Sequence, residues 1–122
     1  MLNNMLNYSN PVHRIFHALA DPTRLSMFEK LCGGPASVSE LANELPVSLP
    51  AVLQHLAVLE ADGIVRSKKV GRVRTCRIEP AALRKADEWV ANRRAMWDHS
   101  LNGLGDYLTE GSTERNGRTN HD

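Results

Sequence analysis

The sequence predicts a mainly α-helical domain with one small two-stranded β-hairpin. Three observations lead to this prediction: apolar residues recur at helical spacing over residues 12–59, β-branched residues flank Gly71, and helical spacing returns after Pro80. The chain has 122 residues, of which 42% are hydrophobic and 24% are charged, as in one ordinary folded domain. This composition excludes collagen, coiled-coil fibres and disulfide-rich miniproteins.

Two helices are predicted before residue 33. The first covers residues 11–20, where apolar side chains recur on one face. Asp21 is a strong N-cap and Pro22 suits the first helical position, so a second helix begins there and stops at Gly33-Gly34-Pro35. The side chains expected to point inward from these helices are Val12, Ile15, Phe16, Leu19, Leu25, Met27, Phe28 and Leu31.

Two shorter helices follow, and a tight turn separates them. Ser37 and Glu40 form a predicted capping box, in which the hydroxyl and the carboxylate satisfy free amides at the start of a helix that ends at Leu45. Pro46 breaks this third helix, and Ser48 caps a fourth helix that runs to residue 63. Two short helices around a tight turn indicate a helix-turn-helix.

A basic β-hairpin is predicted next, with its tip near residues 70–72. The net charge of the chain is only +1, but six of its fifteen Lys and Arg residues fall within residues 66–77, where no acidic residue occurs. They are Arg66, Lys68, Lys69, Arg72, Arg74 and Arg77. Such a cluster is typical of a surface that binds phosphates, and the alternative is a merely solvated hairpin. A helix-turn-helix followed by a basic hairpin is the element order of a winged helix-turn-helix.

A long last helix is predicted from Pro80. Its apolar residues alternate at spacings of three and four, as in a helix that packs against a partner. The tryptophans and Met96 provide more apolar surface than a small domain covers, so we expect a homodimer formed through the first and last helices. The expected dimer-interface residues are Ile15, Leu19, Trp89, Met96, Trp97, Leu101, Leu104 and Leu108. The expected organisation is an N-terminal extension over residues 1–10, a folded domain over 11–110, and a disordered tail over 111–122, which has no apolar residue.

Three segments of the chain resemble the ArsR/SmtB family of bacterial winged-helix repressors. They are residues 18–24 (ALADPTR), 39–42 (SELA) and 50–65 (PAVLQHLAVLEADGIV). The resemblance covers about residues 12–80, and the Trp-rich last helix is similar to that of the metal-independent branch of the family. It implies a homodimeric, cytoplasmic transcriptional repressor whose double-stranded DNA operator has two inverted half-sites.

The fourth helix is the expected recognition helix. Such a helix exposes short or hydrogen-bonding side chains to the major groove and buries its apolar side, for which the expected anchors are Val52, Leu56 and Leu59. Gln54 is the best candidate for a base contact, because its amide can pair with the edge of adenine. The predicted DNA-binding residues are Ser48, Leu49, Ala51, Gln54, His55, Lys68, Lys69, Arg72 and Arg74.

These residues have different expected roles. Ser48 and His55 are expected on phosphates, and Ala51 is placed to read a thymine methyl group or to allow close approach. The hairpin cations are expected to contact phosphates or to enter the minor groove, with Arg72 at the tip the strongest candidate. Leu53 departs from the family, whose members commonly carry a small polar residue there.

The metal ligands of the family are absent, so no metal and no cofactor is expected. Ser37-Val38-Ser39 stands where metal-sensing relatives carry Cys-Val-Cys, and hydroxyls are poor ligands for soft metals. The spacing of ligands that the family requires on its last helix is also missing. His13 and His17 are spaced to chelate one ion, but we interpret them as hydrogen-bonded histidines. Cys32 and Cys76 are expected to be small buried residues with free thiols.

The leading hypothesis is a DNA-binding repressor. A second hypothesis is a winged-helix module that binds another protein through the surface around Trp89, Met96 and Trp97, and the basic hairpin argues against it. An enzyme is the third and weakest hypothesis, because the sequence has no Gly-rich phosphate loop and no nucleophile–base arrangement, and we do not expect one. No apolar run long enough for a membrane span and no signal peptide is seen, so we expect a cytoplasmic protein without a membrane partner.

Overall fold

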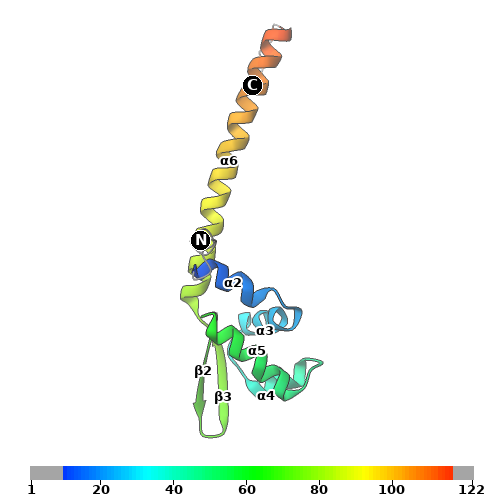
Figure 1. Cartoon of the computed structure of the whole chain (residues 1–122), viewed down its shortest axis with the longest axis vertical. Coiled ribbons are helices and arrows are strands. Elements are labelled where there is room, and N and C mark those ends of the chain that lie inside the picture. Colours follow the sequence, from blue (N-terminus) through cyan, green and yellow to red (C-terminus); the bar gives the residue numbers. More distant parts are fainter. Residues whose placement is uncertain (1–9, 117–122) are drawn as a thin grey trace, which may run out of the picture. The chain divides into compact units, whose positions relative to one another are not determined.

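The computed structural model describes residues 10–116, and its elements follow the predicted order (Figure 1). Its helices are α2 (Pro11–Leu19), α3 (Pro22–Cys32), α4 (Val38–Glu44), α5 (Leu49–Ala61) and α6 (Pro80–Asn116), and its strands are β1 (Ala36–Ser37), β2 (Val65–Val70) and β3 (Val73–Ile78). The boundary between two compact units falls within α6, between Asp87 and Glu88. The winged helix-turn-helix predicted from the sequence is confirmed within the first unit.

The helix starts are set by the side chains that the sequence predicted as caps. Asp21 accepts hydrogen bonds from the amides of Thr23 and Arg24 at 2.9 and 3.0 Å. At the start of α4, the Glu40 amide donates to Ser37 Oγ at 3.0 Å and the Ser37 amide donates to Glu40 Oε1 at 2.8 Å, which completes the capping box. Each cap satisfies amides that a helix leaves without an internal partner, and this decides where the helix begins.

The sheet has three strands, one more than the sequence predicted. Its order is β1-β3-β2, and both pairings are antiparallel. The hairpin turn lies between Val70 and Val73, where Gly71 adopts a positive φ of 63° that favours glycine. The missed strand β1 pairs Ala36 with Cys76 and Ser37 with Thr75, and two residues are too short to show an alternating pattern.

The core of the first unit forms where the four short helices meet the root of the hairpin. Its largest fully buried side chains are Met27, Leu41, Val52, Leu56, Leu59, Ile64 and Cys76. α5 supplies three of them, all 0% exposed, so the predicted recognition helix is anchored along one complete face. Burial of a side chain of this size stabilises the fold by about 1.5–3 kcal/mol, so this anchoring is strong.

Several apolar residues lie elsewhere than the sequence predicted. Phe16 and Leu25 were expected to point inward but are 47% and 40% exposed. Ile15 was expected in a dimer interface but is only 4% exposed and lies in the core of its own unit. Cys32, expected to be buried, is exposed because it occupies the last turn of α3.

The second unit is the part of α6 from Glu88 onward. Described apolar side chains along it are exposed, among them Val90, Met96, Trp97, Leu101, Leu104, Tyr107 and Leu108. The guanidinium of Arg93 lies 4.7 Å from the centre of the Trp89 ring, a cation–π contact. Among the described residues, no helix combines the length and apolar character needed to cross a membrane.

The end of α6 differs from the expected disordered tail. The helix continues to Asn116, past the predicted boundary at residue 110, because extending a formed helix costs less than starting one. The rest of the predicted tail, residues 117–122, and residues 1–9 of the predicted extension lie outside the described residues.

Candidate nucleic-acid interface

The side of α5 that is not buried in the core carries the predicted base-reading residues. Leu49, Leu53 and Gln54 are exposed, and the Ser48 hydroxyl caps the helix by accepting a hydrogen bond from the Ala51 amide at 3.3 Å. Ala51 is half-buried. The first two turns of α5 therefore present one amide side chain among short and apolar ones, which is a surface suited to base edges and thymine methyl groups.

His55 is held closer to the protein than the sequence predicted. Its side chain is half-buried, and its Nδ1 lies 3.8 Å from Asp21 Oδ2. The pKa of Asp21 is lowered, chiefly because the Arg24 amide donates to its carboxylate, with smaller contributions from the Thr23 amide and from His55. The charged form of Asp21 thus connects the start of α3 with the middle of α5.

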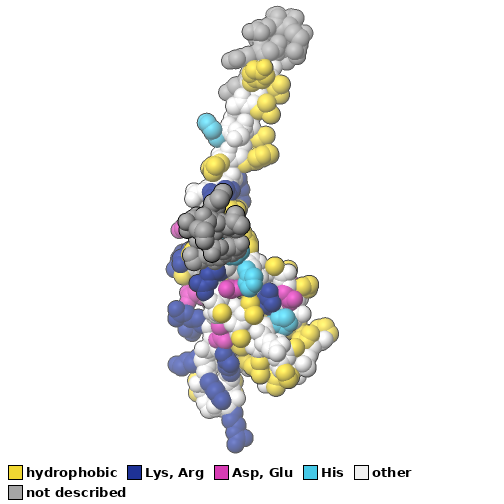
Figure 2. All heavy atoms as spheres, in the orientation of Figure 1, with side chains coloured by type: hydrophobic (Ala, Val, Ile, Leu, Met, Phe, Trp, Pro, Cys, Tyr) yellow, Lys and Arg dark blue, Asp and Glu magenta, His cyan; other side chains and the backbone are white. Residues whose placement is uncertain are grey.

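The wing, which we define as β2, β3 and their turn (residues 65–78), carries all six residues of the basic cluster. Lys68, Lys69, Arg72 and Arg77 are exposed there. Figure 2 shows Lys and Arg side chains gathered along the hairpin. Because these charges lie on a two-stranded ribbon beside the recognition helix, they form a local positive surface on a nearly neutral protein.

A groove of about 540 Å³ lies between the wing and the helix-turn-helix. It is lined by Ser37, Val38, Ser39, Leu49, Leu53, Lys69, Arg72, Val73 and Arg74. The groove brings together four residues predicted from separate parts of the sequence: Leu49 from α5, and Lys69, Arg72 and Arg74 from the wing. We call it the wing groove.

Arg74 differs from the other wing cations, because two side chains of the protein hold it. Its Nε donates to Ser67 Oγ at 2.8 Å, and its Nη2 donates to Glu60 Oε1 at 2.7 Å. Sequence reasoning missed Glu60 and Ser67, because only the register of the hairpin and its packing on α5 bring these residues together. Arg66 is likewise paired, with its Nε 2.5 Å from Glu79 Oε1.

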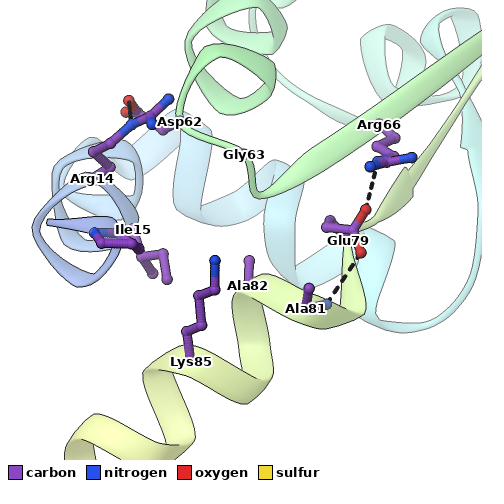
Figure 3. A pocket seen from close by; sticks show the side chains of 10 residues that line it. Arg14, Ile15, Asp62, Gly63, Arg66, Glu79, Ala81, Ala82 and Lys85 are labelled. Carbon is purple, nitrogen blue, oxygen red and sulfur yellow. Dashed lines mark hydrogen bonds and ion pairs between the residues drawn. The ribbon is translucent and has the colours of Figure 1, made fainter. Parts of the chain in front are cut away.

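The opposite end of α5 borders a pocket of about 300 Å³ that is lined by both apolar and charged residues (Figure 3). Arg14, Asp62, Arg66, Glu79 and Lys85 contribute its charged side chains, and Lys85 points into the space. Arg14 faces Asp62, while Glu79 contacts Arg66 and accepts the Ala81 amide at 3.1 Å. The first contact joins α2 to the end of α5, and the contacts of Glu79 join β2 to the start of α6.

Comparison with known proteins decides the family. The sequence pattern of bacterial regulatory proteins of the arsR family matches residues 21–67. The chain is 44% identical to the HTH-type transcriptional regulator Rv2034 of Mycobacterium tuberculosis over 79 residues. This alignment covers 65% of this chain and 73% of Rv2034. The crystal structure of the ArsR family transcriptional regulator RHA00566 superposes with a TM-score of 0.69 at 42% identity, over 73% of this chain and 98% of that one.

The chain belongs to the ArsR family. It is therefore a DNA-binding transcriptional regulator and not an enzyme, as the sequence predicted. A more distant relative, the transcriptional repressor SdpR of Bacillus subtilis, is 24% identical over 90 residues, which span 74% of this chain and 100% of SdpR. The match to the family pattern spans α3 to the start of β2, and so includes the whole helix-turn-helix.

Two residues whose sequence positions were considered in connection with metals, Ser37 and His17, have other partners in the structure. The Ser37 hydroxyl caps α4, and His17 Nδ1 contacts Asp62 Oδ2 at 2.7 Å. Within the described residues, no group of three or more His, Cys, Asp and Glu side chains is arranged to hold a metal ion. Cys76 is buried, and burial raises the pKa of its thiol, whereas Cys32 is exposed on α3.

Proposed function

We propose that this regulator represses transcription as a homodimer on an inverted-repeat operator. In this proposal α5 lies in the major groove and the wing follows the adjacent backbone or minor groove. The observation that carries it is the wing groove, where the exposed face of α5 and the cations Lys69 and Arg72 border the same space. SdpR, a relative along its whole length, is named a repressor, which supports the direction of regulation.

Base reading is assigned to the first two turns of α5. Gln54 is exposed and can pair with the N6 and N7 groups of adenine, a contact worth about 1–3 kcal/mol of discrimination. Leu49 and Leu53 are exposed beside it and suit thymine methyl groups, and half-buried Ala51 lets the helix approach closely. Ser48 and His55 are assigned to phosphates, where a contact fixes the position of the helix without reading sequence.

Backbone binding is assigned to Lys68, Lys69 and Arg72. Each phosphate contact releases counterions, so each changes the slope of log affinity against log salt by about 0.9. The contacts are electrostatic, and affinity should fall steeply as salt is raised. A regulator that binds the bacterial chromosome acts in the cytoplasm, and we place this one there.

Dimerisation is assigned to the exposed apolar side of α6, together with Leu19 of α2, which is half-buried and packs in part against the core of the first unit. Trp97 and Leu104 are 64% and 53% exposed, and the apolar residues recur at spacings of three and four along α6. A second copy of the same helix covers such a surface and doubles the DNA-binding face, as an inverted repeat requires. Ile15 is not part of this assignment, because it is buried in its own unit.

We further propose that DNA binding does not depend on a metal ion at either family site. Ser37 and Ser39 provide hydroxyls in place of thiolates, and hydroxyls are poor ligands for soft metals. The Ser37 oxygen already accepts the Glu40 amide.

A binding titration tests the proposal. The purified protein is titrated into a labelled duplex from the region upstream of its own coding sequence and into a scrambled duplex, at two salt concentrations, each with zinc or with a chelator. We expect dimer stoichiometry, preference for the native duplex, and no effect of zinc. Equal binding to both duplexes that high salt abolishes would overturn the operator proposal, and a zinc-dependent change would overturn the metal-independent one.

Two variants and a control locate the interface. Gln54→Ala should reduce the preference for the native duplex, and Arg72→Gln should weaken binding to both duplexes, each by about tenfold. Arg84→Gln removes the same charge from an exposed position on α6, outside the wing groove, and should change neither. Capture of a protein partner with no loss of DNA binding in Gln54→Ala and Arg72→Gln would favour the protein-interaction alternative.

A further inference from the structure

Three side chains from three elements form a closed ring of hydrogen bonds at the root of the wing. Ser67 Oγ on β2 donates to Glu60 Oε2 on α5 at 2.5 Å. Arg74 on β3 donates from Nε to Ser67 Oγ at 2.8 Å and from Nη2 to Glu60 Oε1 at 2.7 Å. Both carboxylate oxygens and the serine hydroxyl are thus engaged, and we call this set the wing-root ring.

Each hydrogen bond of the wing-root ring joins a donor to an acceptor. The hydroxyl of Ser67 both donates and accepts, the carboxylate of Glu60 only accepts, and the guanidinium of Arg74 only donates. Charge-assisted hydrogen bonds are shorter and stronger than neutral ones, and this ring is half-buried, where water competes less. The ring therefore restrains the distance and angle between α5 and both strands of the hairpin.

The part of the wing between the wing-root ring and the tip has few restraints of its own. β1 pairs with β3 over only two residues, and beyond that level Val70 and Val73 at the wing tip are exposed. An isolated two-stranded hairpin is only marginally stable in water. The wing-root ring therefore restrains the position of the wing tip, with Lys69 and Arg72, relative to Gln54 on α5.

We propose that Glu60 and Arg74 are positioning residues that orient the wing on the recognition helix. Arg74 then contributes to operator affinity through Glu60 and Ser67, and not by binding a phosphate itself. This inference rests on the proposed function, since it concerns the same DNA-binding face. It replaces the prediction from sequence that Arg74 acts like the other wing cations.

Replacement of Glu60 separates a positioning role of Glu60 from a purely electrostatic one, because the two roles predict opposite changes in DNA affinity. Glu60→Gln removes a negative charge beside the DNA, so simple electrostatics predicts tighter binding. The positioning role predicts weaker binding, by about tenfold, because the amide has one acceptor oxygen where the carboxylate has two and the ion pair to Arg74 is lost. The assay is titration of the full-length protein into the upstream duplex described above.

The salt dependence of DNA affinity gives a second readout. Loss of a residue that contacts a phosphate lowers the slope of log affinity against log salt, whereas loss of a residue that only positions the wing does not. Lys69→Gln should lower the slope of log affinity against log salt by about one, as loss of one phosphate contact does. Arg74→Gln should weaken binding by about tenfold with the slope unchanged, and the double variant Glu60→Gln/Arg74→Gln should be no weaker than either single variant. Ser67→Ala keeps both charges and should show a smaller loss in the same direction.

A measurement without DNA checks the wing itself. Limited trypsin cleavage after Lys68, Lys69 and Arg72 should be faster in Glu60→Gln and Ser67→Ala than in the wild type, while the thermal midpoint of the whole protein shows that each variant is folded. Glu29→Gln, which removes an exposed charge from α3, is the matched control and should change neither readout.

Two results would overturn the inference: binding by Glu60→Gln as tight as wild type or tighter, or a slope lowered by about one in Arg74→Gln. Failure of the proposed function is distinguishable, because the wild-type protein itself would then show no preference for the native duplex. In that case the trypsin measurement still decides whether the ring holds the wing.

Discussion

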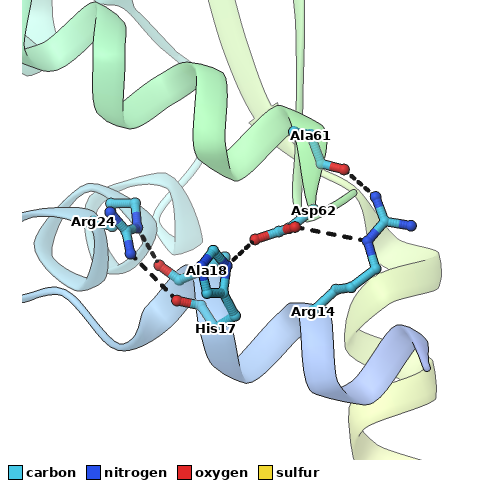
Figure 4. A network of polar contacts seen from close by, with 6 residues as sticks. All are labelled: Arg14, His17, Ala18, Arg24, Ala61 and Asp62. Carbon is cyan, nitrogen blue, oxygen red and sulfur yellow. Dashed lines mark hydrogen bonds and ion pairs between the residues drawn. The ribbon is translucent and has the colours of Figure 1, made fainter. Parts of the chain in front are cut away.

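His17 Nδ1 lies 2.7 Å from Asp62 Oδ2, and the other oxygen of the same carboxylate lies 3.6 Å from Arg14 Nε (Figure 4). His17 and Arg14 are on α2, and Asp62 caps the C-terminal end of α5. Arg14 also donates to the Ala61 carbonyl. These contacts connect α2 to the end of the recognition helix, and His17 and Asp62 are 45 positions apart in the sequence.

Asp62→Asn should destabilise the protein more than removal of a peripheral charge. The substitution keeps one acceptor oxygen but loses the charge that faces both Arg14 and His17, and we expect a loss of about 1 kcal/mol in the free energy of unfolding. Glu44→Gln, the control, removes the Lys30 ion pair at a side chain that is 57% exposed, whereas Asp62 is 14% exposed. Urea unfolding measures both variants, and an equal effect would contradict the assignment.

The Asp21 cap predicts a dependence of stability on pH. Because its folded-state pKa lies below the ordinary value of 3.8, its contribution is complete well above that pH and is lost as pH falls through the folded-state value. Asn also caps helices well, so Asp21→Asn isolates the charge. The thermal midpoint of the wild type should exceed that of Asp21→Asn at neutral pH, and the gap should close in acid. A gap that stays constant with pH would contradict this cause.

The two thiols should react at different rates in the folded protein. Cys32 is exposed at the end of α3, whereas Cys76 is buried on β3 and its thiol pKa is raised by burial, so little reactive thiolate forms. Labelling near neutral pH with an aromatic disulfide reagent that releases a coloured thiolate should modify Cys32 quickly and Cys76 only in urea. Cys32→Ser should therefore abolish the fast phase, and rapid labelling of both thiols would contradict the burial.

The exposed apolar side of α6 should hold the dimer together. Leu104→Glu places a charge where the proposed partner packs, and we expect at least a tenfold weaker dimer, on the order of 1.4 kcal/mol. Val73→Glu introduces the same charge at a wing residue of matched exposure, 54% against 53%, and should leave the dimer intact. Sedimentation equilibrium decides the matter, and a monomeric wild type would remove the proposed interface.

Two leucines of α5 that differ in burial should respond differently to truncation. Leu56 is fully buried, so Leu56→Ala should cost about 2–5 kcal/mol of stability through lost burial and a cavity. Leu53 is exposed in the wing groove, so Leu53→Ala should cost less than about 0.5 kcal/mol. Its effect should appear instead in operator preference, measured by the duplex titration. A large loss of stability in Leu53→Ala would contradict the assignment of Leu53 to the exposed lining of the wing groove.

Local chemistry in the sequence determined the elements and their order. Asp21, the Ser37–Glu40 pair and Ser48 begin helices wherever they stand before a helical pattern, and Gly71 supplies the positive φ that the hairpin turn needs. These effects act over four residues or fewer, so they can be read without a structure. The helical spacing of Val52, Leu56 and Leu59 likewise indicated which side of α5 is buried.

Only the tertiary structure decided what distant residues do to one another. It added β1 to the sheet, buried Ile15 within its own unit, exposed Cys32, and joined Arg74 to Glu60 and Ser67. The physical reason is that a side chain's burial and partners depend on where other segments come to lie. Sequence spacing shows which cations share the wing, but only packing shows which of them another side chain already holds.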